Sequence, residues 1–200
     1  MSSMRDIHSV IKPLMESLVG SVVEIGSDRG GGSTRALSEL CENFGLKFYS
    51  VDFEEGAFLR AQEIIGDGAY QMTGEFFLSD VFPKEERICL AYLDNFDLVW
   101  PAIEEKPRVL RIAKLYQEYG FEMTNTESKR VHLLQCIEIE KLAAGKCIVV
   151  LDDTWFRRTG FDGKGGLAAP HLVKMGFNLF HVTTGPSPHH CFIMLERGLK

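Results

Sequence analysis

The sequence contains no apolar stretch that approaches the roughly 18 residues a membrane-spanning helix needs. Its N-terminus, MSSMRDIHSV, also lacks the apolar segment of a signal peptide. No cluster of Lys and Arg stands out, and 28 acidic residues outnumber 22 basic ones, for a formal net charge of −6. These absences argue against export, membrane insertion and a nucleic-acid phosphate backbone as the partner. We therefore expect a cytoplasmic protein.

Cysteine is scarce and follows no pattern. The five cysteines form no C-x-x-C pair, their number is odd, and three of them lie in apolar segments typical of strands. No disulfide framework is indicated, and we expect reduced cysteines in the core. The nucleophile motif G-x-S-x-G, which would indicate a serine hydrolase, is also absent. The cysteines are Cys41, Cys89, Cys136, Cys147 and Cys191.

What the sequence does contain is an alternation of apolar strands and helices along 200 residues, a length typical of one domain. Almost continuously apolar segments such as ICLAYL and KCIVVL predict strands that are covered on both faces. Strands that alternate with helices indicate βαβ units and a parallel sheet. Helices are expected over 5–18, 34–44, 54–65 and about 127–143, with a short one ending at 175.

The C-terminal strands and one long connection depart from this alternation. The linker TTGPSPHH is too short for a crossover helix, so the last two strands should be antiparallel. The prediction is one domain, residues 1–200, with a three-layer α/β/α Rossmann-like sandwich, a mostly parallel seven-stranded sheet and an antiparallel C-terminal edge pair. Two prolines interrupt residues 97–126. This insert is either an acceptor-binding lid or an extra helix that pads the sheet.

The strongest local motif is the glycine-rich turn VVEIGSDRGGGST, in which an apolar strand leads through glycines into a helix that begins near Ser33. Glycines let a ligand approach the main chain, and the helix N-terminus favours a carboxylate or phosphate. Asp52 ends the next strand, where an acid can accept hydrogen bonds from ribose hydroxyls. Two common motifs are excluded. A P-loop needs Lys where Gly32 stands, and no G-x-G-x-x-G begins at Gly26 or Gly30.

The spacing E-x-G-x-x-x-G, formed by Glu24, Gly26 and Gly30, resembles the first motif of class I S-adenosylmethionine-dependent methyltransferases. Asp52, in FYSVDF, resembles the acid of their second motif. The resemblance implies that both glycines pass beneath S-adenosylmethionine, that Glu24 supports its amino-acid end, and that Asp52 holds its ribose. By position, residues 73–75 would line the adenine. The cofactor-binding residues expected on this basis are Glu24, Gly26, Ser27, Gly30, Ser33, Asp52, Gly74, Glu75 and Asp94.

Acidic side chains end two further strands. Asp94 follows ICLAYL, and the pair Asp152 and Asp153 follows KCIVVL. Because these strands are expected to be neighbours, the three carboxylates should converge on the cofactor crevice, where they repel one another unless a cation or hydrogen-bond donors compensate. Mg²⁺ prefers such oxygen ligands. The alternative is that Asp94 orders the crevice while the acid pair caps the next segment.

These acids narrow the resemblance to metal-dependent O-methyltransferases of the catechol and bacterial sugar types, which implies Asp94, Asp152 and Asp153 as Mg²⁺ ligands. Such a metal would hold the acceptor hydroxyl and lower its pKa. The sequence departs from both types after Asp94. Asp97 stands where the catechol type has its lysine base, and Phe96 stands where the sugar type has a second acid. The identity of the catalytic base therefore stays open.

The candidates for this base are Asp97, His132 and His171, and Asp94 is a further catalytic candidate. For His132 the alternative is a packing histidine on a helix. Lys164, in FDGKGGL, could bind an anionic part of the acceptor. The simpler interpretation is a solvated lysine in a plain loop.

The expected function is S-adenosylmethionine-dependent O-methylation of a small hydroxylated acceptor, such as a sugar, polyketide or phenol, with Mg²⁺ as a second cofactor. Two alternatives stay open. One is a non-catalytic Rossmann-like domain for ligand sensing or assembly, with residues 97–126 as its interface. The other is a metal-independent methyltransferase acting on nitrogen or a protein side chain. The acceptor is not fixed by the sequence, because variable loops build acceptor pockets in this fold, and a homodimer is compatible with the sequence.

Overall fold

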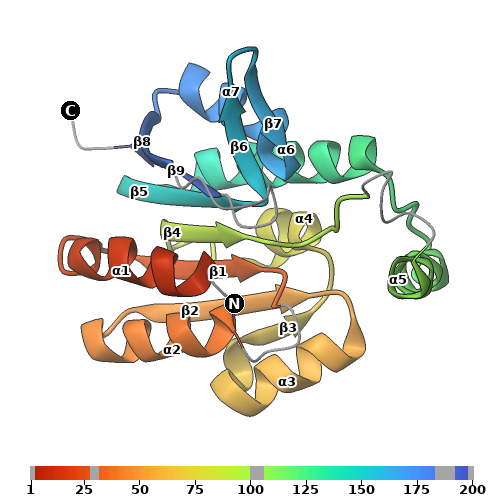
Figure 1. The fold of residues 1–200 in the computed structure, drawn as a ribbon. Helices are drawn as coiled ribbons and strands as arrows, with labels where there is room; N and C mark the ends of the chain where they lie inside the picture. The colour runs from red at the N-terminus through yellow and green to blue at the C-terminus, as the bar shows by residue number, and fades with distance from the viewer. Residues whose placement is uncertain (1–2, 28–31, 100–105, 183–191, 198–200) are drawn as a thin grey trace.

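The structure is a computed structural model that describes residues 3–27, 32–99, 106–182 and 192–197. Within this part of the chain, seven strands form one sheet with the order β3-β2-β1-β4-β5-β9-β8 (Figure 1). These strands are β1 (Ser21–Ile25), β2 (Lys47–Asp52), β3 (Ala69–Gln71), β4 (Ile88–Leu93), β5 (Ala143–Asp152), β8 (Asn178–Val182) and β9 (Phe192–Arg197).

The strand directions follow the predicted pattern. β1 pairs in parallel with β2 and β4, while β3 pairs in parallel with β2, and β5 with β4. β9 is antiparallel to both of its neighbours, β5 and β8, so the C-terminal edge of the sheet is antiparallel. The prediction of a Rossmann-like sandwich around a mostly parallel sheet is confirmed.

Helices cover both faces of the sheet. α1 and α2 pack on one face, where their apolar side chains meet Val22, Leu90 and Ile148. α6, α7 and the turn that follows α4 pack on the other face, and α3 packs beside α2 against β2 and β3. The helices are α1 (Ser3–Met15), α2 (Ser33–Phe44), α3 (Glu55–Ile65), α4 (Gly74–Phe76), α5 (Pro107–Glu118), α6 (Asn125–Leu142) and α7 (Ala168–Lys174).

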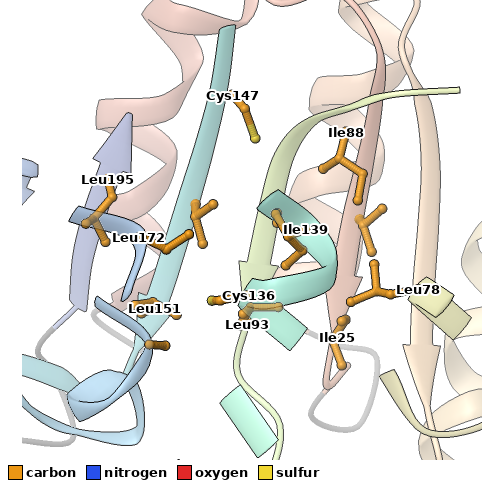
Figure 2. Packing of buried hydrophobic residues seen from close by; sticks show 14 of the residues in the cluster. Ile25, Leu78, Ile88, Leu93, Cys136, Ile139, Cys147, Leu151, Leu172 and Leu195 are labelled. Carbon is orange, nitrogen blue, oxygen red and sulfur yellow. The ribbon is translucent and has the colours of Figure 1, made fainter. Parts of the chain in front are cut away.

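The core on the α6 side is drawn in Figure 2. Cys136 and Ile139 of α6 point toward the sheet, beside Leu93 of β4, and all three side chains are fully buried. Along β1, Val22 lies in the core under α1 and α2, whereas Val23 lies in the core under α6. Successive strand residues point to opposite faces, so a sheet covered on both sides needs this unbroken apolar sequence.

Two features of the fold are not determined by the sequence: the hairpin after the fifth strand is not predicted, and the helix in the insert is one of two alternatives. A hairpin of β6 (Thr154–Arg157) and β7 (Gly160–Gly163) follows β5 directly. Strands of four residues are too short to show an alternating pattern. The second feature is α5, which lies inside the 97–126 insert and beyond the carboxyl ends of the parallel strands (Figure 1). The insert therefore lies at the end of the sheet where the candidate site residues gather.

Four of the cysteines, Cys41, Cys89, Cys136 and Cys147, are free and buried, as the sequence predicts. Cys191 lies outside the described residues. Among the helices that the structure describes, none is long and apolar enough to span a membrane.

Neighbouring phenylalanines offer a matched test of this core. Phe77 is fully buried and packs against Tyr49, Tyr70 and Phe82, whereas Phe76 is 52% exposed. Phe77→Ala should lower the free energy of unfolding by about 3–5 kcal/mol, because it removes a buried ring and leaves a cavity. Phe76→Ala should change it by less than about 0.5 kcal/mol. Urea denaturation of both variants measures this difference, and equal losses would contradict the described register of this turn.

Candidate active site

A pocket opens at the carboxyl ends of β1, β2 and β4. Its lining includes Asp52, Phe53, Glu75 and Phe96. In an open α/β sheet this edge is where ligands bind, because the loops that follow parallel strands meet there. The pocket thus brings together two acids from the predicted cofactor set and three aromatic rings, the third being that of Phe121.

The first part of the glycine turn is built by close backbone packing. Gly26 has a φ of +92°, and a Cβ placed there would overlap the main chain of Asn95. Its N–H donates to the carbonyl of Val51 at 2.9 Å. Only glycine combines this dihedral angle with such an approach, so Gly26 fixes the end of β1 against the loop after β4. Gly30, the second predicted glycine, lies outside the described residues.

Glu24 is fully buried beneath this turn. Its Oε2 accepts hydrogen bonds from the hydroxyls of Thr34 at 2.7 Å and Ser50 at 2.6 Å. Its Oε1 is buried and has no hydrogen-bond partner of normal geometry among the described residues. Burial raises the pKa of Glu24 to about 7, although the nearby hydroxyls of Ser33, Ser50 and Thr34 oppose this shift. Glu24 is thus a buried acid that orders the glycine turn from beneath.

Asp52 binds the turn through its carboxylate. Its Oδ2 accepts the backbone N–H of Ser27 at 2.9 Å and the Ser27 hydroxyl at 3.2 Å, and its Oδ1 accepts the N–H of Glu54 at 3.0 Å. Burial raises the pKa of Asp52, while these hydrogen bonds lower it. A carboxylate offers about four acceptor positions, so Oδ1 retains one for a ligand. Asp52 both orders the turn and faces the pocket.

Residues 73–75 border the same pocket, as the resemblance implies. A Cβ at Gly74 would overlap the side chain of Ile25, so glycine lets α4 begin close to the end of β1. Glu75 lines the pocket, and its Oε2 accepts a hydrogen bond from Gln135 Nε2 at 3.3 Å. Burial raises the pKa of Glu75. This corner of the pocket thus carries a second acid that donors of a ligand could reach.

The insert covers the pocket with aromatic rings. Phe53 packs edge-on against Tyr116, Tyr119 and Phe121, with ring centroids 5.2–5.3 Å apart. Phe53 follows β2, whereas the other three rings come from α5 and the residues after it. The Tyr119 hydroxyl also accepts the backbone N–H of Glu55 at 3.3 Å. The insert packs onto the rim of the pocket rather than onto a face of the sheet.

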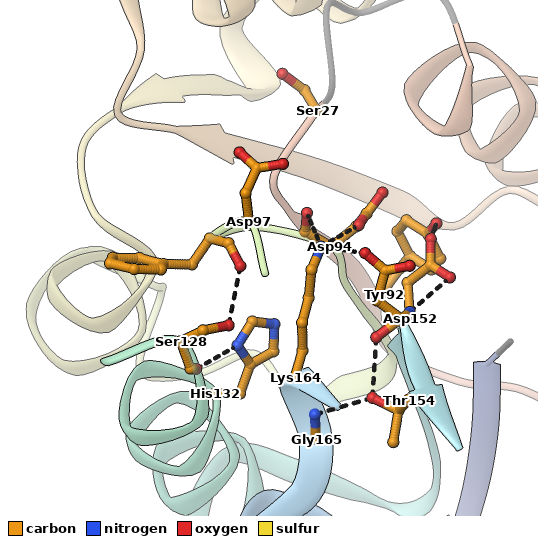
Figure 3. Close-up of polar contacts among 12 residues, drawn as sticks. Ser27, Tyr92, Asp94, Asp97, Ser128, His132, Asp152, Thr154, Lys164 and Gly165 are labelled. Atoms are coloured by element: carbon orange, nitrogen blue, oxygen red, sulfur yellow. Dashed lines mark hydrogen bonds and ion pairs between the residues drawn. The ribbon is translucent and has the colours of Figure 1, made fainter. Parts of the chain in front are cut away.

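The three predicted strand-end acids do converge, but around a lysine. Figure 3 shows the Lys164 side chain reaching from the end of the β6–β7 hairpin to Asp94. Its Nζ lies 2.7 Å from Asp94 Oδ1, 3.2 Å from the Asp94 carbonyl oxygen and 3.2 Å from Asp153 Oδ2. The Lys164 side chain is only 3% exposed. The expectation of a solvated lysine is therefore wrong, because the hairpin returns the chain onto the end of β5.

Asp152 is held separately from this ion pair. Its Oδ2 accepts the Tyr92 hydroxyl at 2.9 Å, and its Oδ1 accepts the backbone N–H of Asp153 at 2.9 Å (Figure 3). The residue is 6% exposed. Donors within the protein thus bind both oxygens of the third carboxylate.

The charges of this cluster are strongly coupled. Burial raises the pKa of Asp94 well above its usual value, the Lys164 ammonium opposes this, and repulsion from Asp152 and Asp153 adds to it. Burial alone would lower the pKa of Lys164, but the carboxylates of Asp94 and Asp153 outweigh it and raise that pKa. Lys164 consequently stays charged, and the cluster holds a proton more readily than isolated aspartates would.

The residues do not fit the predicted Mg²⁺ site. The Lys164 ammonium lies between Asp94 and Asp153, where a shared metal ion would have to lie. A divalent cation there would contact a buried positive charge, and its third predicted ligand, Asp152, already accepts two hydrogen bonds. In the part of the chain that the structure describes, no group of three or more His, Cys, Asp or Glu is arranged to hold a metal.

Both loops that carry the cluster bend through left-handed residues. Phe96 has a φ of +59° and Asp153 a φ of +45°, values that are costly for residues other than glycine. Phe96 is held there by the Ser128 hydroxyl, which donates to its carbonyl at 2.9 Å, and by the Tyr116 ring at 4.7 Å. Such strain persists only where surrounding contacts enforce it, and here it flanks the acid cluster.

The three candidates for the base lie in different settings. His132 is fully buried, and its Nδ1 bonds the Ser128 carbonyl at 2.8 Å, so Nδ1 carries the proton and Nε2 is an acceptor. Nε2 has no partner among the described residues. Burial, aided by the Lys164 charge, lowers the pKa of His132 to about 3. His132 is thus a neutral hydrogen-bond acceptor beside Lys164 (Figure 3).

Asp97 and His171, the other two candidates for the base, lie in surroundings different from those of His132. The backbone N–H of Asp97 donates to the Tyr116 hydroxyl at 3.0 Å, and the exposed Asp97 side chain contributes negative charge near Lys164. His171 lies on α7, which packs against α6. Its Nε2 is buried without a hydrogen-bond partner among the described residues. The roles of both residues as a base stay predictions.

Comparison with known proteins places the fold. No protein-family model and no curated protein matches the chain. A magnesium protoporphyrin IX methyltransferase from Synechocystis, with bound SAM, has a TM-score of 0.51 and 11% identity over 96% of this chain and 77% of that one. A Clostridium thermocellum protein provisionally described as an rRNA methylase has a TM-score of 0.55 and 11% identity over 100% and 97% of the two chains.

A third similar structure comes from Streptococcus mutans. This protein, provisionally described as a methyltransferase and in complex with SAH, has a TM-score of 0.51 and 12% identity over 94% of this chain and 96% of that one. At such identities the likeness shows the fold alone, which this chain shares with these structures.

The buried Glu24 should make stability depend on pH. Its pKa rises from 4.5 to about 7 on folding. Because the folded state binds this proton more tightly, stability falls as the pH rises from 4.5 to 7 and stays lower above 7, by roughly 3 kcal/mol. Glu24→Gln carries no charge, so in the ligand-free protein it should become more stable than the wild type above pH 7 and lose that advantage below pH 4.5.

Urea denaturation across this pH range measures the difference, with the exposed Glu39→Gln of α2 as the control. A difference between Glu24→Gln and the wild type that does not vary with pH would contradict the assigned burial of this carboxyl group.

Proposed function

We propose that the chain is a methyltransferase that uses S-adenosylmethionine to methylate a small acceptor through an O–H or N–H group. The observation that carries this proposal is the pocket lined by Asp52 and Glu75, with Glu24 buried beneath its glycine turn and the Asp94–Lys164 pair at the next strand end. A ligand with several hydrogen-bond donors would fill the pocket beside Asp52 and Glu75. The methyl acceptor would lie beside Asp94.

The residues present fit the cofactor. Glu24, buried beneath the turn, would support the amino-acid end of the cofactor by holding the hydroxyls of Thr34 and Ser50 in place. The ribose of the cofactor would bind the remaining position on Asp52 Oδ1, and its adenine would lie against the aromatic rim near Phe53 and beside Glu75. The SAM and SAH in the Synechocystis and Streptococcus mutans structures, which share this fold, support the choice of cofactor.

The bound cofactor supplies an electrophilic methyl group on a positively charged sulfur. The residues of the chain orient the acceptor and manage its proton. Asp94 accepts the proton that the O–H or N–H group loses, and Lys164 holds the Asp94 carboxylate in position for this step. As the acceptor gains positive charge, the carboxylates beside it stabilise that charge.

Assistance by Mg²⁺, which the sequence predicts, is not carried into this proposal. The Lys164 ammonium already lies between the two carboxylates that would bind the ion. Sugars, polyketides and phenols remain suitable acceptors because each presents a hydroxyl group that donates a hydrogen bond. Amines are suitable because their N–H groups also donate hydrogen bonds.

Calorimetric titration of the purified protein with S-adenosylmethionine and S-adenosylhomocysteine tests the proposal. We expect binding in the micromolar range, about −8 kcal/mol, with and without Mg²⁺. Asp52→Ala should weaken it by at least roughly ten-fold, because the ribose loses an acceptor and the Ser27 turn loses its anchor. Asp67→Ala, an exposed acid in the turn after α3, is the matched control and should bind like the wild type.

Failure of the folded wild-type protein to bind either compound would exclude the proposed cofactor and favour a non-catalytic domain. Binding that survives Asp52→Ala unchanged would place the cofactor elsewhere on the protein.

A further inference from the structure

The position of Lys164 is fixed by the backbone of the hairpin that carries it. The Lys164 N–H donates to the carbonyl of Asp153 at 3.1 Å, so the end of β7 closes onto the end of β5. Gly163 has a φ of +85°, and a Cβ there would overlap that same carbonyl and the Trp155 ring. The Thr154 hydroxyl accepts the N–H of Gly165 at 2.9 Å. The hairpin thus returns its lysine to the base of the acid cluster.

The ammonium group has no donor left for a ligand. A lysine has three N–H donors, and three oxygens lie within 3.2 Å of Nζ, two from Asp94 and one from Asp153. Lys164 is therefore placed to balance and hold the carboxylates, and not to bind an anionic acceptor. The sequence-based expectation that Lys164 binds an anionic part of the acceptor finds no free donor here.

A buried lysine is costly unless carboxylates compensate it, and the carboxylates are costly unless a cation compensates them. Each side of the pair thus accounts for the burial of the other. The shared space between Asp94 and Asp153 accommodates one cation, and the chain itself provides it.

We propose that Lys164 is a resident counter-ion that takes the place a divalent cation would occupy between Asp94 and Asp153, so that this crevice works without a metal. The metal-free working of the crevice rests on the proposed function, whereas the occupation of the cation position does not. Lys164 is a positioning residue in this proposal, because it acts by orienting Asp94.

The test measures metal binding in the cofactor-free protein, so it does not depend on S-adenosylmethionine. Mn²⁺ is titrated and the free ion is followed by electron paramagnetic resonance, with Mg²⁺ as a competitor. The wild type and its Asp94→Asn variant should bind Mn²⁺ equally, because the wild type has no Mn²⁺ site at Asp94. Lys164→Ala should gain a site at least roughly ten-fold tighter than any wild-type binding, since it leaves carboxylates without a cation.

Two variants serve as controls. Lys129→Ala, on α6, removes a lysine–aspartate pair with Asp162 of the same hairpin and should gain no site. Adding Asp153→Asn to Lys164→Ala should abolish the gained site. Mn²⁺ should also raise the melting temperature of Lys164→Ala and not that of the wild type. A merely structural lysine would not produce this pattern.

Two results would overturn the proposal. One is a wild-type Mn²⁺ site that Asp94→Asn removes, which is decisive even if Lys164→Ala fails to fold. The other is a folded Lys164→Ala protein that gains no site. Because the titrations omit the cofactor, absence of S-adenosylmethionine binding in the separate calorimetric experiment would defeat the proposed function and leave this result intact.

Discussion

The compensation of charge at the carboxyl end of the sheet is the constraint on which the site depends. Parallel pairing of β4 with β5 brings Asp94 next to Asp152 and Asp153, and burial forbids three bare carboxylates there. The structure meets this constraint with the Lys164 ammonium for two of them and with Tyr92 for the third. The hairpin that carries Lys164 and the bend at Asp153 place the ammonium within reach.

The sequence predicts most of the fold because local patterns of apolar and polar residues specify most of its strands and helices. Unbroken apolar segments such as Ile88–Leu93 identify buried parallel strands, and the short linker before β9 excludes a crossover. The β6–β7 hairpin is different. Its strands are four residues long, β7 begins and ends with glycine, and their pairing is fixed by the return of Gly163 onto the end of β5. A contact of this kind cannot be predicted from the periodicity of apolar residues in the sequence.

The same distinction between local sequence patterns and tertiary contacts applies to the site. Convergence of the strand-end acids could be predicted, because parallel strands end at one edge of a sheet. The cation among them could not, because Lys164 lies in a sequence typical of a solvated turn and is brought inside only by tertiary contacts. Burial of His132 agrees with the packing interpretation, yet its open Nε2 and its position beside Lys164 depend on helix packing that the sequence does not specify.

The kind of cation decides what chemistry the crevice can support. A divalent ion would bind the acceptor directly and act as a Lewis acid on its hydroxyl. An ammonium with all donors engaged leaves the cluster with excess negative charge and with further acceptor positions on the Asp94 carboxylate. Such a surface repels an anionic acceptor and favours one that donates hydrogen bonds and becomes positive during transfer. On the proposed function, selection among acceptors would therefore rest on proton donation more than on metal chelation.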